Sequence, residues 1–287
     1  MQTVRPAAVA GMFYPEARAA LGSTVRTHLA KAAPSAGDKA ELPKALIAPH
    51  AGYVYSGPVA ASAYARIAAG REIIRRVVLL GPAHRVPIRG LALPVAQAFA
   101  TPLGNVEIDA AAASDAHALA QVRTSEAAHA LEHALEVQLP FLQLLLEEFR
   151  IVPFVVGDAT AAEVAAVIDR LWGGPETLIV VSSDLSHYHP HAEARALDQR
   201  TSKDILALAS SLDHEQACGA TPINGFALCA RRRGLTAELL DLRNSGDTAG
   251  DKSRVVGYAA FALTEPAADR LRGAAEATAQ VAEETTA

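Results

Sequence analysis

Three histidines of this chain follow short apolar segments at the point where each segment turns polar. Residues 45–49 lead into His50, residues 77–80 lead through GPA into His84, and residues 178–181 lead through SSDLS into His187. Where helices cover both faces of a sheet, ligands bind beyond the carboxyl ends of the strands. One such histidine is typical of an ordinary loop, but three in the same position indicate a shared site.

The chemistry of imidazole suggests what such a site would do. Neutral imidazole binds transition metals, and with an unperturbed pKa of about 6.5 it also moves protons near neutral pH. His50 and His84 are therefore predicted to be metal ligands, and His187 a proton carrier. Asp184 fits the third place in the two-histidine, one-carboxylate arrangement of non-haem iron enzymes, or it orients a histidine by accepting its free ring N–H.

A cysteine offers the other choice of third ligand. Cys218 stands just before an expected helix start, with Thr221 as the N-cap and Pro222 at the first helical position. A helix N-terminus favours the thiolate, which is the form that binds metals. A small buried residue is equally consistent with the sequence. Cys229 lies within the same expected helix and is interpreted as core filling.

A second group of titratable residues lies between residues 126 and 140. His129, Glu132 and His133 match the H-x-x-E-H pattern of inverzincin metallopeptidases. Because residues four apart share a helix face and Ala-rich helices readily produce such patterns, a solvated, charged helix face is the preferred interpretation. Pro140 predicts a kink or break near the end of this helix. The other histidines are expected on the surface or beyond the strand-end position: His28, His117, His189, His191 and His214.

The elements that would position these side chains alternate along the chain. Continuous apolar runs predict strands covered on both faces, at residues 45–49, 77–80, 151–156, 178–181 and 255–263. Aliphatic residues at helical spacing predict helices at residues 58–69, 129–148, 161–172 and 192–209. Residues 91–101 and 237–244 are further candidate strands, of antiparallel type. The pattern predicts an α/β fold, a three-layer α/β/α sandwich with a mostly parallel or mixed central sheet.

Composition narrows the class of protein. The 287 residues are 51% hydrophobic and carry 26 Lys and Arg against 31 Asp and Glu, a formal net charge of −5. The hydrophobic content excludes disorder for most of the chain. The charge balance lacks the basic excess of a nucleic-acid-binding surface. Two cysteines make no disulfide framework, and no apolar run reaches the roughly 18 residues of a membrane helix. With no secretory signal at the start, we expect a soluble cytoplasmic protein with neither nucleic acid nor membrane as a partner.

The expected organisation is one domain over residues 1–265. The Ala- and Glu-rich segment 266–287 is predicted to be a frayed helix or a disordered tail.

Several motifs, in order along the chain, closely resemble those of the Memo family, called AmmeMemoRadiSam system protein B in prokaryotes. They are AGMFYP at 10–15, APHAGY at 48–53, GPAH at 81–84, EHALEVQLP at 132–140, SSDLSH at 182–187, and CG at 218–219 with PI at 222–223. The matches run from about residue 5 to about residue 262, and jointly they are highly specific.

The resemblance implies a fold similar to class III extradiol ring-cleaving dioxygenases of the LigB type, which use non-haem iron(II). It also implies that the metal ligands correspond to His50, His84 and Cys218, and that His187 resembles the acid/base histidine of those enzymes. Asp184, His133 and Glu136 resemble pocket residues of the family. A thiolate stands where the dioxygenases have a carboxylate, and this softer ligand shifts the preference toward copper(I) or zinc.

These observations lead to one leading hypothesis and two alternatives. The leading hypothesis is a metal-dependent redox enzyme, with iron(II) favoured and copper or zinc as alternatives. In it Asp184 or Glu136 fixes histidine tautomers and Tyr53 lines the pocket. The alternatives are a zinc hydrolase with His187 or Glu136 as base, and a non-catalytic protein that binds a metal, a small molecule or a peptide. The prokaryotic family name also implies a functional link to radical SAM and AMMECR-type proteins.

Overall fold

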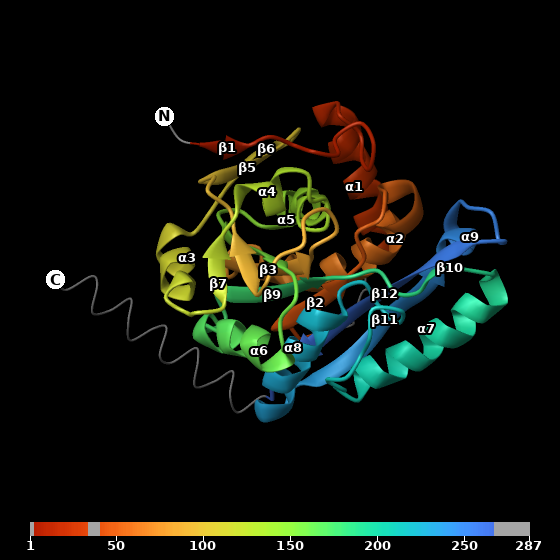
Figure 1. The fold of residues 1–287 in the computed structure, drawn as a ribbon. Helices are drawn as coiled ribbons and strands as arrows, with labels where there is room; N and C mark the ends of the chain where they lie inside the picture. The colour runs from red at the N-terminus through yellow and green to blue at the C-terminus, as the bar shows by residue number, and fades with distance from the viewer. Residues whose placement is uncertain (1–2, 34–40, 267–287) are drawn as a thin grey trace.

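The apolar segments form the centre of one mixed sheet in the computed structural model, which describes residues 3–33 and 41–266 (Figure 1). The predicted tail lies outside these residues except for Pro266. Four strands run parallel in the spatial order β2, β9, β3, β8: β2 (Ala45–Ala48), β9 (Thr177–Ser182), β3 (Arg76–Pro82) and β8 (Arg150–Val156).

Further strands extend this sheet on both sides. On the β2 side these are β12 (Val255–Thr264), antiparallel to β2, with β10 (His187–His189) and β11 (Thr236–Asn244) paired to it. On the β8 side these are β4 (Leu91–Leu93) and β7 (Val122–Thr124). A separate three-stranded sheet holds β1 (Val4–Arg5), β5 (Ala98–Thr101) and β6 (Gly104–Glu107). The predicted mixed sheet is confirmed.

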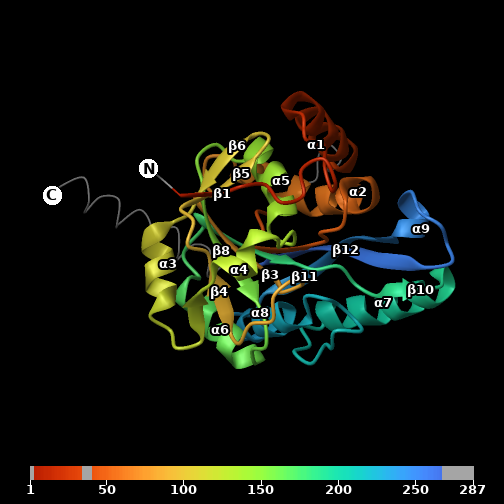
Figure 2. The same cartoon turned by 45° about the horizontal axis from the view of Figure 1, so that its top comes forward.

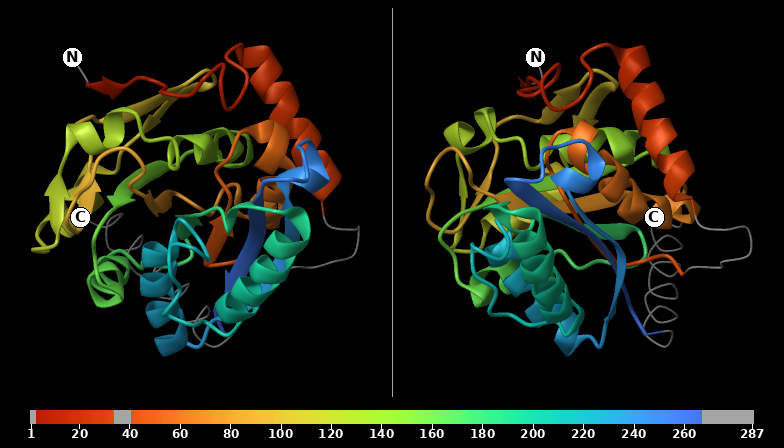
Figure 3. Two further views of the ribbon diagram at one scale, coloured as in Figure 1. Left: turned by 45° about the vertical axis from the view of Figure 1, so that its right-hand side comes forward. Right: turned by 90° about the vertical axis from the view of Figure 1, so that its right-hand side faces the viewer.

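Helices cover both faces of the central sheet, as Figures 2 and 3 show. Successive strand residues point to opposite faces, so Leu46 and Leu79 join one apolar core while Ile47 and Leu80 join the other. Over the first core lie α1 (Arg18–Ala32), α2 (Tyr53–Tyr64), α4 (Glu126–Ala130) and α5 (Leu139–Leu145). Over the second lie α3 (Ala110–His117), α6 (Ala161–Arg170), α7 (His191–Leu206) and α8 (Ala220–Arg232). A short helix, α9 (Ser245–Thr248), precedes β12.

Some expected boundaries are wrong. The segment 91–101 divides into β4 and β5, which belong to different sheets. Helix α2 begins at Tyr53, five residues before Pro58, and a 3-10 helix, η1 (Ala65–Gly70), continues it.

The expected helix over 129–148 is broken. Helix α4 ends after Ala130, and a 3-10 turn, η2 (Glu136–Gln138), precedes α5. Pro140 lies in the first turn of α5, where a missing N–H removes no helical hydrogen bond. The proline therefore begins a helix instead of ending one.

Within residues 3–33 and 41–266, none of the helices has the length and apolar character needed to cross a bilayer.

Candidate metal centre

The carboxyl ends of three parallel strands bring together the residues that the sequence singles out. His50 lies two residues after β2, His84 two after β3, and Asp184 two after β9. The rings of His50 and His84 have centroids 5.1 Å apart and meet edge to face. The Asp184 carboxylate accepts a hydrogen bond of 2.8 Å from the His50 backbone N–H. The sequence pattern thus predicted a real convergence of side chains at one sheet edge.

A third histidine joins this pair from the segment between α4 and η2. The His133 ring lies 4.7 Å from the His84 ring and 5.4 Å from the His50 ring, between centroids. Each of the three histidines has a ring nitrogen that lies within 4.8 Å of the others, so the group could hold a metal ion. The resemblance placed His133 in the pocket; the geometry adds that it is a potential ligand.

Cys218 brings sulfur to the same place. Its Sγ lies 3.3 Å from His50 Nε2 and accepts a hydrogen bond of 3.3 Å from the Asp184 backbone N–H. Gly219 allows this approach, because a Cβ there would lie 2.6 Å from the Ser183 Cβ and 2.9 Å from the Ser182 carbonyl oxygen. A bulkier residue at 219 would push the cysteine away from β9.

The helix after Cys218 differs from its prediction. Helix α8 begins at Ala220 with Gly219 as its N-cap, so Thr221 is a helical residue and not the cap. Burial, with a contribution from Asp184, raises the pKa of the Cys218 thiol to about 12. The expected lowering by the helix N-terminus is therefore outweighed in the metal-free protein, and a bound metal would have to displace the thiol proton. Cys229 is fully buried in the second core, as predicted.

Hydrogen bonds fix the proton on the His50 ring. The Ser182 hydroxyl donates to the Ala134 carbonyl at 2.6 Å and accepts from the Gln138 side-chain amide at 2.8 Å. Since its single proton is committed, Ser182 Oγ accepts from His50 Nδ1, which lies 2.8 Å away. His50 Nε2 is then left without a proton and faces Cys218 Sγ, which is the state a metal ligand needs.

Glu132 performs the same task for His84. Its carboxylate accepts from the His84 backbone N–H at 2.7 Å, lies 2.9 Å from His84 Nδ1, and also accepts from the Ala134 N–H. Burial acts to raise the pKa of Glu132, but the hydrogen bonds from His84 and Ala134 outweigh it and hold the pKa at about 2. The expected solvated helix face is wrong here, since Glu132 and His129 are buried. Sequence reasoning assigned Glu132 no role in the site, and the signal was its place beside His133.

Two of the three imidazoles, those of His50 and His133, are neutral near pH 7. Burial, strengthened by the neighbouring histidines, lowers the pKa of His50 well below its usual range and that of His133 to about 4. His133 Nδ1 is buried without a hydrogen-bond partner among the described residues, although Glu132 Oε1 lies 3.4 Å away. A buried, unpartnered nitrogen beside two oriented imidazoles and a sulfur fits a transition metal or zinc.

A cavity of about 620 Å³ opens beside this centre, and His50, His84, His133, Asp184 and His187 contribute to its wall. None of the hydrogen bonds within the described residues involves the His187 ring, which leaves its nitrogens for a ligand. Tyr188 follows with a positive φ of 64°, its side chain exposed and covered on one face by Arg254, 5.1 Å from the ring centroid. Aromatic residues complete the wall: Phe13, Tyr55, Tyr188 and Tyr258.

Two predicted pocket residues lie elsewhere. Tyr53 does not line the cavity; it is buried in the first core with its hydroxyl donating to the Val137 carbonyl at 2.7 Å. Tyr55, two residues on, takes the place expected for it. Glu136 does not fix a histidine tautomer, because its carboxylate binds the N-terminal segment through Arg5, the Ala8 and Val9 N–H groups and the Tyr14 hydroxyl. That segment carries Phe13, whose ring contacts His133 with centroids 4.7 Å apart.

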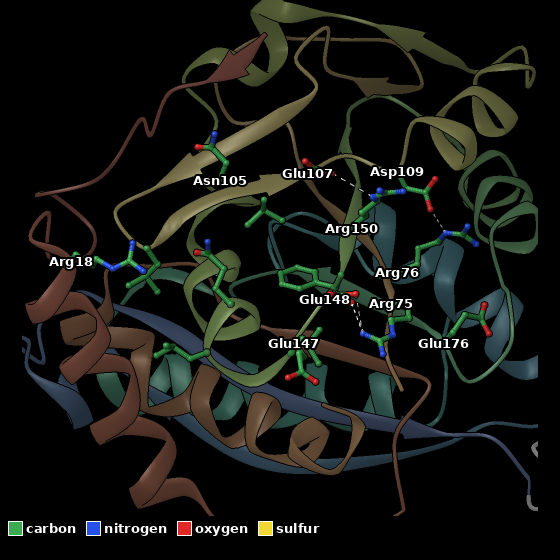
Figure 4. Close-up of a pocket in the computed structure, with 16 residues that line it drawn as sticks. Arg18, Arg75, Arg76, Asn105, Glu107, Asp109, Glu147, Glu148, Arg150 and Glu176 are labelled. Carbon is green, nitrogen blue, oxygen red and sulfur yellow. Dashed lines mark hydrogen bonds and ion pairs between the residues drawn. The ribbon is translucent and has the colours of Figure 1, made fainter. Parts of the chain in front are cut away.

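A second cavity, of about 680 Å³, lies at the amino ends of the same strands (Figure 4). Six of its charged residues form ion pairs: Arg76 with Asp109 at 2.8 Å, Arg150 with Glu107 at 3.6 Å, and Arg75 with Glu148 at 4.0 Å. Among the described residues, the group that could hold a metal ion lies at the carboxyl ends and not in this cavity.

The chain matches known proteins over nearly all of the described fold. The family model described as "Memo-like protein" matches residues 5–262. A MEMO1 family protein of Aquifex aeolicus is 39% identical over 272 residues, covering 89% of this chain and 97% of that protein. Similar proteins of the same description come from Methanothermobacter thermautotrophicus, 37% identical with 89% and 99% coverage, and Methanopyrus kandleri, 36% identical with 90% and 98% coverage.

Proposed function

Since this chain belongs to the Memo family, we propose that it is a metal-dependent redox enzyme whose metal is held by His50, His84 and Cys218. The observation that carries the proposal is the approach of Cys218 Sγ to the unprotonated Nε2 of His50, 3.3 Å away, beside the side chains of His84 and His133. Iron(II) is the metal we favour, with copper and zinc as the alternatives that a thiolate ligand suggests.

The surroundings of each residue indicate its proposed role. Ser182 and Glu132 orient His50 and His84, so that a nitrogen of each faces the centre. When bound, the metal would supply redox chemistry and polarise a ligand that reaches it. His187 lines the cavity with free ring nitrogens and is proposed to take a proton from, or give one to, a substrate oxygen.

Asp184 is proposed to stabilise positive charge that develops on the nearby imidazoles. Its carboxylate lies 4.0 Å from His50 Nε2. Burial raises its pKa, while the hydrogen bond from the His50 N–H acts in the opposite direction.

Glu136 is unavailable as a base, because its carboxylate oxygens are occupied by the N-terminal segment. A zinc hydrolase in the same site would therefore rely on His187.

The test is the metal content of protein purified without oxygen. His50→Ala, His84→Ala and Cys218→Ala are each expected to lose the metal, whereas Cys229→Ala, which removes the buried thiol, keeps it. His133→Ala distinguishes a three-histidine site from the proposed one. If His133→Ala loses the metal and Cys218→Ala keeps it, the third ligand is His133 and not Cys218. Unchanged metal in the first three variants would overturn the proposal.

Activity with different metals separates the function classes. Turnover of a substrate library with iron or copper, dependent on an oxidant, would support the redox enzyme. Turnover with zinc in the absence of oxygen would favour the hydrolase. Tight binding without turnover under any of these conditions would identify a metal- or ligand-binding protein. We place this activity in the cytoplasm, where Cys218 stays reduced.

A further inference from the structure

A third cavity reaches the metal donors through a different wall. Its volume is about 700 Å³, and His84 and Cys218 both line it. The cavity that contains His187 is lined by His50, His84 and His133 but not by Cys218. Among the described residues, His84 is the one side chain that lines both cavities. Cys218 therefore lines one cavity, whereas His50 and His133 line the other.

The accessibility of the donors forms a gradient. The side chain of His84 is 27% exposed, that of His133 is 13% exposed and that of His50 is 2% exposed. Cys218 is only partly buried. An ion arriving through the third cavity would therefore meet Cys218 and His84 first and the deeply buried His50 last.

The wall of this cavity also carries outer groups that suit a metal ion. His214, predicted from sequence to be a surface residue, is exposed and lines the cavity, with Nδ1 3.3 Å from the Cys218 carbonyl oxygen. Asp158 and Arg85 line it too, and their formal charges cancel, so the wall presents no net barrier to a cation. Imidazole and carboxylate are both metal ligands.

We propose that metal ions enter and leave the centre through this cavity, by way of Cys218 and His84, while the cavity with His187 receives the organic ligand. As the sulfur binds the metal, the thiol proton leaves to solvent. The separation would let the protein exchange its metal while a ligand fills the other cavity. This inference rests on the proposed metal site, whose residues it uses.

The experiment narrows each cavity in turn and follows two rates. Thr221→Trp and Val86→Trp place an indole in the third cavity from different elements, and Val256→Trp places one in the cavity with His187. The first rate is alkylation of Cys218 by iodoacetamide in metal-free protein, located by mass spectrometry, with the fully buried Cys229 as internal reference. The second is cobalt(II) uptake, followed by the thiolate-to-cobalt absorption band. Thermal unfolding checks that each variant is folded.

Thiol reactivity depends on access to the sulfur, so both third-cavity variants are expected to slow alkylation and uptake by about tenfold. Val256→Trp should change either rate by less than about twofold, and all variants should reach the same final cobalt content.

Uptake that stays fast in both third-cavity variants, even with slower alkylation, would overturn the entry route while leaving the metal site intact. Slower uptake in Val256→Trp alone would also overturn the entry route and leave the metal site intact. If the unmodified protein binds neither cobalt nor zinc, the proposed function fails, and the entry route fails with it.

Discussion

Cavities of similar volume, about 620 and 680 Å³, lie at the two ends of the parallel strands, but their titratable residues differ in exposure and in charge. At the amino ends, pairs such as Arg75 and Glu148 are 46% and 87% exposed, and each charge is compensated by its partner and by water. At the carboxyl ends, His50 is buried and neutral, and its hydrogen bond to Ser182 leaves one ring nitrogen free.

The difference shows how burial changes what a polar group can do. Exposed ion pairs contribute little, because water screens them. Buried groups must be hydrogen-bonded or must neutralise, so the neutral His50 and the ionised Glu132 are each held in one protonation state and one orientation. An arrangement of this kind prepares unpaired nitrogen and sulfur donors for a ligand.

The largest predicted effect concerns the buried ion pair beside the candidate metal centre. Arg5 and Glu136 are 2.6 Å apart, with side chains 1% and 0% exposed. Replacing Arg5 by Met leaves Glu136 buried without its cation, and we expect a loss of about 3 to 5 kcal/mol in the free energy of unfolding. Urea unfolding measures it.

Arg75→Met is the matched control at the amino ends and should cost less than about 1 kcal/mol. Equal costs for the two variants would show that the two ends do not differ as described.

The next effect is a loss of stability at acid pH that comes from the buried His129. Burial lowers the pKa of His129 to about 4, whereas the unfolded chain titrates it near 6.5. As pH falls from about 6.5 to about 4, the unfolded state takes up the proton first, so His129 should remove about 3 kcal/mol of stability. In contrast, Asp109 at the amino ends has a lowered pKa, and its contribution is lost only as pH falls below its usual value of 3.8.

The measurement is urea unfolding of metal-free protein at pH 7, 5 and 4. In His129→Gln, the amide can still donate to the Ala92 carbonyl, which the His129 ring contacts at 2.8 Å. This variant should lose part of the pH dependence. An unchanged slope between pH 7 and 4 would mean that His129 does not titrate as inferred.

Features set by local sequence patterns could be predicted, whereas features set by contacts between residues far apart in the chain could not. The runs that became β2, β3, β8, β9 and β12 were predicted because burial on both faces requires continuous apolar residues, and the strand-end residues His50, His84 and Asp184 follow from that placement. The broken helix around His133 was missed, because its breaks depend on tertiary contacts of Glu132 and Glu136 with residues about 48 and 131 positions away. The same limit applies to Tyr53, whose direction is set by packing against the Val137 region.

A smaller effect is expected on metal affinity. Glu132→Gln keeps the volume but removes the charge that fixes His84, and loss of such a partner weakens metal binding by about 10- to 100-fold. Competition with a chelator of known affinity measures it. Glu148→Gln, an exposed carboxylate of the amino-end cavity, should leave the affinity unchanged. A Glu132→Gln protein that binds as tightly as the unmodified one would remove Glu132 from the centre.

The smallest effect tests the best-formed pair of the amino-end cavity. Arg76 and Asp109 are 2.8 Å apart, yet 31% and 13% exposed, so a double-mutant cycle should give a coupling of about 1 kcal/mol or less. Asp109 also caps α3 by accepting from the Ala112 N–H, so the cycle uses Asp109→Asn, which preserves the cap, with Arg76→Ala. A coupling of about 3 kcal/mol or more, as large as the loss expected for Arg5→Met, would place this pair with the buried one despite its exposure. Short distance alone, and not burial, would then decide the strength of ion pairs in this fold.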